Sequence, residues 1–227
     1  MASQSAGFWI KGDDPTTLFQ GTDETTPVTA FGDVVGRAND QRVGAGSPIS
    51  STQSTTSFRP KYQSTGLAFD GTDDNLPTNY TAGSGANFLI AKVVVPASLG
   101  AAQLVAGTST GVPGRFFLGF NTAGQVVGGV GGTTVDTIVG AVDRRGTTVV
   151  VGISAESGVV RLFDVSAVAF EGAYTAAPNT TVPFRLGCQN VDGVATTFFG
   201  GSGAHFLGGR EFIDEARFQQ IANALGA

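Results

Sequence analysis

Short apolar runs rich in β-branched and aromatic residues recur about every ten residues between Gly66 and Gly209. Glycine, proline, asparagine and threonine separate these runs, most of which are too short for helices. The pattern is typical of a β-sandwich or barrel and not of alternating strands and helices. It predicts strands at Gly66–Asp70, Phe88–Val95, Gln103–Gly107, Arg115–Phe120, Val126–Val130, Val135–Val139, Thr147–Ser154, Val159–Asp164, Val182–Gly187 and Ala204–Gly208.

Local sequence also predicts how some of these strands are connected and covered. Asn121–Gly124 and Glu156–Gly158 have the composition of hairpin turns, because glycine and asparagine tolerate positive φ. Thr148–Ile153 is an almost unbroken apolar run, which indicates a central strand covered on both faces.

Two segments predict helical structure. The apolar residues of Ile213–Leu225 recur at roughly helical spacing, with Asp214 as the N-cap and Gly226 as the C-cap. Asp14 followed by Pro15 predicts a capped single turn near the N-terminus. We therefore expect an all-β sandwich with a short amphipathic helix at its C-terminal end.

Composition excludes several classes of protein. The single cysteine, Cys188, cannot form an intrachain disulfide, and a net charge of −5 without a basic patch predicts no nucleic-acid partner. No apolar stretch is long enough for a membrane-spanning helix, so no membrane partner is expected. The first twelve residues lack the basic and apolar regions of a signal peptide.

Three parts of the sequence carry a family resemblance: Asp14–Gln20 with Thr25–Gly36, Arg59–Tyr62 with Leu67–Asp74, and the closing segment Arg210–Leu225. In this order they resemble the laminin-G-like, concanavalin A-type jelly-roll proteins of tailed bacteriophages and prophages. The resemblance covers nearly the whole chain. It implies a jelly roll with two antiparallel sheets, and we expect one such domain over residues 1–227. The polar residues beside an apolar triplet at its start make residues 1–12 a candidate N-terminal arm.

The same resemblance implies a function. We expect a non-enzymatic virion protein, assembled in the host cytoplasm, that serves as a capsid decoration, a head fibre or a tail-associated part. Its partners would be other capsid or tail proteins, and a homo-oligomer would be symmetric. The alternative is a carbohydrate-binding adhesin that recognises a host-surface glycan, as lectins do.

The densest acidic cluster contains Asp70, Asp73 and Asp74, which are candidate calcium ligands. Calcium takes six to eight oxygen ligands, and the spacing here is not that of an EF-hand loop. The competing interpretation is a turn whose aspartates accept hydrogen bonds from nearby backbone N–H groups. We expect the turn, and no cofactor.

Aromatic residues provide two further candidates. Tyr80 and Tyr174 lie in polar segments and are candidate glycan-stacking residues, although isolated surface tyrosines are common. Phe8, Trp9 and Ile10 form an apolar triplet beside a polar end of the chain, so they either pack on the sandwich or bind a partner protein.

No catalytic set is evident in the sequence. His205 is the only histidine, and Gly107–Gly111 matches Gly-x-Ser-x-Gly but precedes a strand instead of the required helix. The five glutamates do not form the paired array of a jelly-roll glycosidase. We therefore expect no enzymatic activity.

Overall fold

The computed structural model describes residues 7–42, 49–83, 85–109, 114–131, 136–165, 167–174 and 181–226. Residues 1–6 of the candidate arm, Val135 of an expected strand, and Thr110 and Gly111 of the Gly-x-Ser-x-Gly match lie outside this part.

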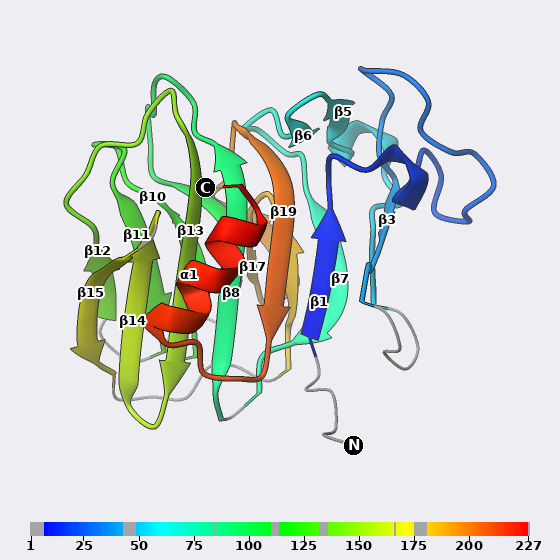
Figure 1. The fold of residues 1–227 in the computed structure, drawn as a ribbon. Coiled ribbons are helices and arrows are strands. Elements are labelled where there is room, and N and C mark those ends of the chain that lie inside the picture. Colours follow the sequence, from blue (N-terminus) through cyan, green and yellow to red (C-terminus); the bar gives the residue numbers. More distant parts are fainter. Residues whose placement is uncertain are drawn as a thin grey trace.

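Two sheets pack face to face, and one helix lies on the outer face of the front sheet (Figure 1). The front sheet has the order β15-β14-β13-β8-β19-β6-β5, and β1 pairs with β19 beside this path. Its strands are β1 (Gly7–Lys11), β5 (Lys61–Gln63), β6 (Gly66–Ala68), β8 (Asn87–Val94), β13 (Thr148–Glu156), β14 (Val159–Asp164), β15 (Ala167–Ala173) and β19 (Ser202–Gly209).

The back sheet has the order β12-β11-β10-β9-β16-β7-β4-β3-β2, and β17 lies beside β9 and β18. Its strands are β2 (Leu18–Phe19), β3 (Arg37–Asn39), β4 (Ser50–Thr52), β7 (Leu76–Thr81), β9 (Gln103–Ser109), β10 (Phe116–Phe120), β11 (Val126–Val130), β12 (Asp136–Val139), β16 (Pro183–Leu186), β17 (Gln189–Val191) and β18 (Val194–Thr196). Apart from a parallel pairing of β17 with β9, the neighbouring strands are antiparallel. The expected all-β, two-sheet antiparallel sandwich is therefore confirmed.

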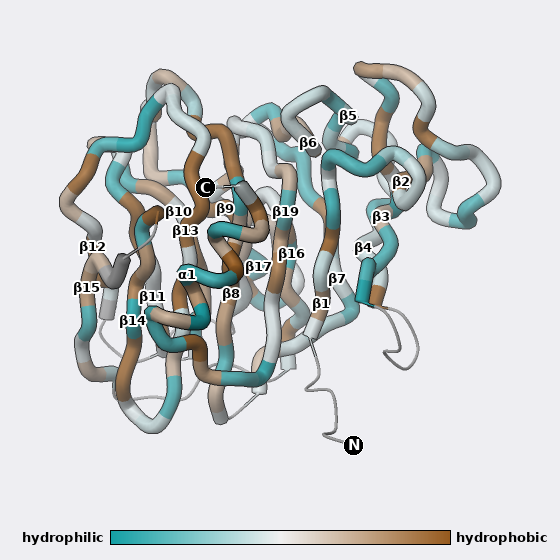
Figure 2. The backbone as a smooth tube through the Cα atoms, viewed as in Figure 1, coloured by the Kyte–Doolittle hydropathy of each residue, from teal (hydrophilic) through white to brown (hydrophobic). Residues whose placement is uncertain are grey.

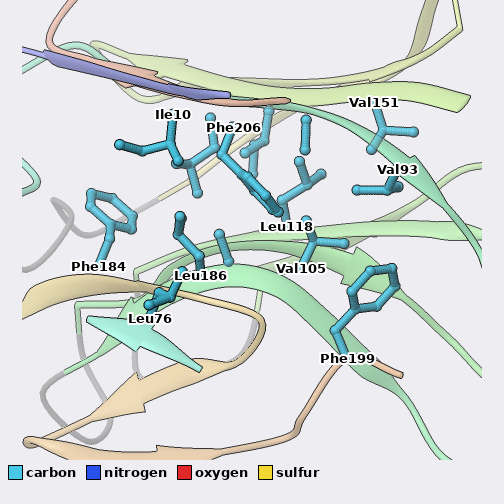
Figure 3. Close-up of a cluster of buried hydrophobic side chains, with 14 of the residues drawn as sticks. Ile10, Leu76, Val93, Val105, Leu118, Val151, Phe184, Leu186, Phe199 and Phe206 are labelled. Atoms are coloured by element: carbon cyan, nitrogen blue, oxygen red, sulfur yellow. The ribbon is translucent and has the colours of Figure 1, made fainter. Parts of the chain in front are cut away.

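The main core fills the space between the sheets. Figure 3 shows Ile10, Val93, Val151 and Phe206 of the front sheet facing residues of the back sheet such as Leu118. Along β8 the alternate residues Leu89, Ala91 and Val93 point into this core. Period-two alternation therefore sets which face of each strand is buried.

A second apolar cluster lies on the outer face of the front sheet, beneath the helix α1 (Glu215–Ala224). It joins Phe88 and Ile90 of β8, Val150 of β13 and Phe163 of β14 to residues of α1 and its flanks. Figure 2 shows hydrophobic residues along these same three strands. The central strand β13 is thus covered on both faces, as predicted.

The predicted helix and its N-cap are confirmed. The Asp214 carboxylate accepts a hydrogen bond of 2.8 Å from the Arg217 N–H, and Lys92 of β8 donates to the carbonyl oxygens of Leu225 and Gly226 at the other end. Asp14 likewise caps the short turn η1 (Pro15–Thr17). No helix in the described part of the chain is long and apolar enough to span a bilayer.

The N-terminal arm requires a correction. Gly7–Lys11 form β1, which pairs with β19 along its whole length, and Phe8 and Ile10 are buried in the core. The apolar triplet is a sheet strand because its alternate residues match the buried face of the neighbouring strand. Of the triplet, only Trp9 keeps partial exposure.

Candidate functional site

A hollow of about 320 Å³ opens where β5 and β6 meet the turn before β7. Figure 1 shows β5 and β6 in its upper part. We call this hollow the rim pocket. Both cationic and carboxylate side chains line it. Its lining residues are Val34, Thr56, Ser57, Arg59, Lys61, Ala68, Phe69, Asp70 and Asp74.

Arg59 follows the short turn η2 (Thr56–Phe58) and forms one wall of the rim pocket. Its guanidinium donates to the carbonyl oxygens of Gln53 at 2.8 Å, Gln20 at 2.8 Å and Ser54 at 3.0 Å. A Cβ at Gly36 would lie 2.9 Å from Nε of Arg59, so glycine there leaves room for the guanidinium. Arg59 therefore ties its own segment to Gln53, Ser54 and Gln20 and fixes the shape of the pocket.

Lys61 begins β5 and extends from the exposed face of that strand. Its strand partners are Ala68 on one side and Val34 on the other. Among the described residues, no hydrogen bond or ion pair engages its ammonium group. Burial and the charge of Asp70 raise the pKa of Asp74, and the positive charge of Lys61 offsets a small part of that rise, so Lys61 interacts electrostatically with this pocket carboxylate.

The acidic cluster forms the turn that the sequence favoured over a calcium site. Oδ1 of Asp70 accepts hydrogen bonds from the N–H groups of Thr72, Asp73 and Asp74, at 2.8, 3.1 and 3.3 Å. Oδ2 of Asp74 accepts one of 3.0 Å from the Asp70 N–H. Hydrogen bonds from backbone N–H groups to these carboxylates therefore stabilise the turn locally.

These contacts give the carboxyl groups different acidities. Burial raises the pKa of Asp70, but the three backbone donors outweigh burial and hold it below its ordinary value. Burial, followed by the charge of Asp70, raises the pKa of Asp74 to about 6. One oxygen from each of Asp70, Asp73 and Asp74 lies within 4.8 Å of the others, so the predicted residues do come together. Three carboxylates supply only part of a calcium shell, and calcium binding stays an untested alternative to the turn.

Two exposed aromatic residues belong to chain segments that form the rim pocket, but neither is among its lining residues. Phe31 is 67% exposed, and its ring centroid lies 5.4 Å from that of Tyr62, which is on the opposite face of β5 from Lys61. Phe58 is 38% exposed and directly precedes Arg59, while its carbonyl oxygen accepts the Asn75 N–H. Exposed large apolar side chains beside polar groups are typical of a ligand site.

The two tyrosines predicted to stack on a glycan are not at this site. Tyr80 is only 4% exposed, because its ring stacks on Phe184 and meets the edge of Phe8 within the core. Burial raises its pKa to about 12. Tyr174 packs partly against the same core, after β15, which lies at the opposite edge of the front sheet from β5. The glycan prediction for Tyr80 is thus corrected, and for Tyr174 it stays a prediction.

His205 and Cys188 are engaged elsewhere. His205 is buried between the Trp9 indole, whose Nε1–H donates to Nδ1 at 3.4 Å, and the Asp13 carboxylate, which is 3.7 Å from Nε2. In the part of the chain that the structure describes, no hydroxyl or thiol donates to this imidazole. Burial raises the pKa of the Cys188 thiol to about 12, so it is a weak nucleophile.

Sequence reasoning missed Lys61 as a site residue. Lys61 belongs to a strand of only three residues, which is too short for its alternation to be recognised in the sequence.

No family model and no curated protein matches the sequence. Several solved structures share the fold. The CBM40 of the Ruminococcus gnavus IT-sialidase is 18% identical, with a TM-score of 0.52 over 61% of this chain and 83% of that one. The same module bound to α2,6 sialyllactose is 17% identical, with a TM-score of 0.52 over 62% and 84% of the two chains.

A Trypanosoma rangeli sialidase in complex with 2,3-difluorosialic acid is 11% identical, with a TM-score of 0.60. That match covers 85% of this chain and 33% of the sialidase. Such low identities establish the fold alone. They agree with the expected concanavalin A-like sandwich, and they contain nothing that indicates a phage origin.

Proposed function

We propose that this chain is a carbohydrate-binding protein and that the rim pocket is its binding site. The observation that carries the proposal is one hollow in which the ammonium group of Lys61, unpaired among the described residues, lies with the carboxylates of Asp70 and Asp74. Lys61 offers N–H donors and the aspartates offer acceptor oxygens, and the exposed Phe58 directly precedes the lining residue Arg59.

This combination suits a sugar for a chemical reason. Each sugar hydroxyl both donates and accepts hydrogen bonds, so a site with ammonium and carboxylate groups side by side can satisfy it in both directions. The C–H face of a sugar ring is apolar, and aromatic side chains pack against such surfaces. A few placed polar groups beside apolar area are the usual composition of a small-molecule site.

The shared fold supports the class of function. One matching structure is a carbohydrate-binding module bound to sialyllactose, and this supports the lectin-like alternative better than a structural role in a virion. Capsid or tail partners, and a location on a phage particle, stay predictions from the family resemblance. Quantifying the protein in purified particles would test them.

We propose binding without turnover. His205 is held by Trp9 and Asp13, and Oδ1 of Asp70 is occupied by three backbone N–H groups of its own turn. Release of reducing sugar from any bound glycan would contradict this part of the proposal.

A glycan array followed by calorimetry tests the proposal, with sialyllactose and neutral oligosaccharides among the probes. Lys61→Met should weaken binding about tenfold or more, because a hydrogen bond to a charged group contributes about 1.5–3 kcal/mol. Phe58→Ala should also weaken it, because Phe58 is 38% exposed and lies between the lining residues Ser57 and Arg59. The matched control is Phe170→Ala on β15, since Phe170 is 42% exposed but lies at the far edge of the sheet.

All three substituted side chains are exposed, so melting temperatures close to that of the wild type are expected and should be verified. The proposal fails if no glycan binds. It also fails if Lys61→Met and Phe58→Ala bind as tightly as Phe170→Ala.

A further inference from the structure

A second hollow, of about 450 Å³, adjoins the rim pocket, and both are lined by Ala68 and Phe69. We call it the inner hollow. Beyond the two shared residues it is bounded by Gln63 and Thr65 of the β5–β6 hairpin, by Ser202 at the start of β19, and by the loop that contains Gly146.

Strand register shows that both hollows lie on one face of the front sheet. Val34 pairs with Lys61, Lys61 with Ala68, Ala68 with Ser202, and Ser202 with Val94. Side chains at paired positions point to the same side of a sheet. This row crosses four strand spacings of about 4.8 Å, or about 19 Å in all. The two hollows are therefore parts of one groove that runs across the strands and exceeds one sugar ring in length.

The strand β5 supplies one polar side chain to each hollow. Lys61 lines the rim pocket, and Gln63, two residues further along, lines the inner hollow. Residues i and i+2 of a strand share a face, so both side chains rise from the same surface. Within the described residues, the Gln63 amide makes no hydrogen bond, whereas the neighbouring Thr65 hydroxyl accepts one of 2.8 Å from Ser202.

Small side chains at the boundary leave the two hollows connected. Ala68 is half-buried and separates them with a single methyl group. Gly201 lines the inner hollow, and a Cβ there would lie 2.3 Å from the Val94 carbonyl oxygen, so packing beneath the groove requires glycine.

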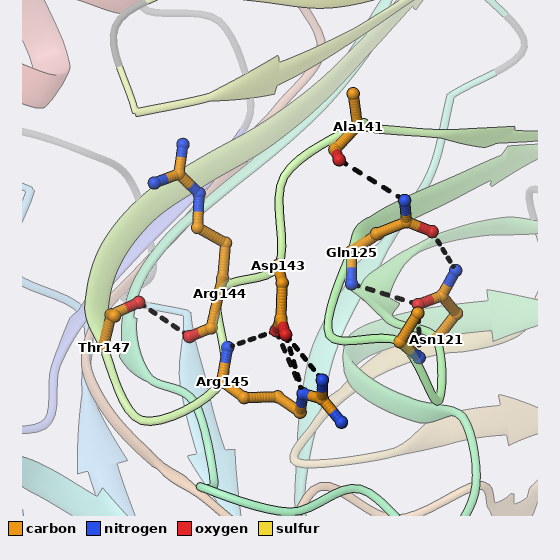
Figure 4. A network of polar contacts seen from close by, with 8 residues as sticks. Asn121, Gln125, Ala141, Asp143, Arg144, Arg145 and Thr147 are labelled. Carbon is orange, nitrogen blue, oxygen red and sulfur yellow. Dashed lines mark hydrogen bonds and ion pairs between the residues drawn. The ribbon is translucent and has the colours of Figure 1, made fainter.

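The far wall of the inner hollow is held in place by its own contacts. Figure 4 shows the Asp143–Arg145 ion pair and the hydrogen bond from the Thr147 hydroxyl to the Arg144 carbonyl, which brace this loop. The Gly146 N–H donates to the carbonyl oxygens of Val95 and Pro96. The wall is thus pre-formed, which lowers the entropic cost of binding.

We propose that the rim pocket and the inner hollow are adjacent subsites for a linear, uncharged oligosaccharide of at least two sugar units. This inference rests on the proposed function and specifies its ligand class. One unit contacts Lys61, Asp70 and Asp74, and the next contacts Gln63 and Thr65. An uncharged ligand fits because the two cations and two aspartates of the rim pocket balance, and none of the described residues that line the inner hollow is charged.

Calorimetry of the full chain with ladders of one to six units in the maltose, cellobiose and chitobiose series tests the proposal, with sialyllactose as the charged comparison. For the series that binds, affinity should rise about tenfold from one unit to three and then level off. Gln63→Ala should weaken the trimer about three- to tenfold and leave the single unit unchanged. Gln219→Ala, an exposed glutamine on α1, should match the wild type.

Ala68→Leu provides a second test, because the larger side chain closes the passage and should remove the gain with length. Equal affinity for all lengths, or an unchanged trimer affinity in Gln63→Ala, would overturn the two-subsite groove. If Lys61→Met still abolished binding in that case, the proposed function would stand. Absence of binding across every ladder and sialyllactose would overturn both.

Discussion

The ring of Phe218 on α1 lies parallel to the ring of Phe163 on β14, with centroids 4.5 Å apart and an angle of 12° between the planes. Both side chains are fully buried on the outer face of the front sheet. Gly152 makes the approach possible, since a Cβ there would lie 2.9 Å from the Phe218 ring. The stack attaches the C-terminal helix to the sandwich.

Phe218→Ala should therefore lower the free energy of unfolding by about 3–5 kcal/mol, the usual cost of truncating a buried phenylalanine. Urea denaturation measures this change. Gln220→Ala, an exposed position on the same helix, is the control and should change stability by less than about 0.5 kcal/mol. A loss below about 1 kcal/mol for Phe218→Ala would mean that the helix does not pack on the sheet.

Strands could be predicted from the sequence where the buried positions are occupied by apolar residues. They could not be predicted where polar residues occupy buried positions. All ten strands expected between Gly66 and Gly209 have counterparts in the structure. The strand β7 was missed because Thr78 and Pro77 make its sequence resemble a loop. Thr78 and Tyr80 nevertheless both face inward, and the Thr78 hydroxyl donates to the Phe184 carbonyl at 2.9 Å.

The candidate site was harder to predict than the fold. Asp70, Asp73 and Asp74 are close in sequence, so their contacts could be predicted from the hydrogen-bonding pattern of a local turn. Lys61 and Gln63 become site residues only because β5 pairs with β6 and with Val34. Such pairings of short strands are set by tertiary packing, which local sequence does not encode.

The raised pKa of Asp74 predicts a specific dependence of stability on pH. The pKa in the folded protein is about 6, above the ordinary value of 3.8. The folded state thus holds the proton more tightly than the unfolded state. The stabilisation that this provides is complete below pH 3.8 and is lost as pH rises through 6. Asp74→Asn keeps an oxygen acceptor for the Asp70 N–H but carries no charge.

The melting temperature of Asp74→Asn minus that of the wild type should therefore be larger at neutral pH than in acid. Melting curves of both proteins between pH 4 and 7 measure the difference. Asp73→Asn is the matched control in the same turn. A constant difference between Asp74→Asn and the wild type across this range would contradict the prediction.

Calcium should leave the melting temperature unchanged. Oxygens of Asp70 and Asp74 already accept backbone N–H groups, and a ligand that binds only the folded state would raise the melting temperature. Thermal melts with calcium and with a chelator make the comparison. A calcium-dependent rise that Asp73→Asn abolishes would instead establish a metal site in this turn.

Trp9 is the only tryptophan, so its fluorescence reports on the contact with His205. Burial lowers the pKa of His205 below 6.5, while Asp13 acts in the opposite direction and Lys11 and Lys92 add to the lowering. The neutral ring accepts the indole N–H at Nδ1, but a protonated ring has no acceptor there.

Acidification should therefore change the Trp9 emission with a midpoint below pH 6.5, and His205→Gln should remove that transition. Because the folded protein resists protonation of this histidine, the contact also stabilises the fold above pH 6.5, and this contribution is lost as pH falls. A wild-type fluorescence transition centred above pH 6.5, or one retained in His205→Gln, would exclude His205 as its source.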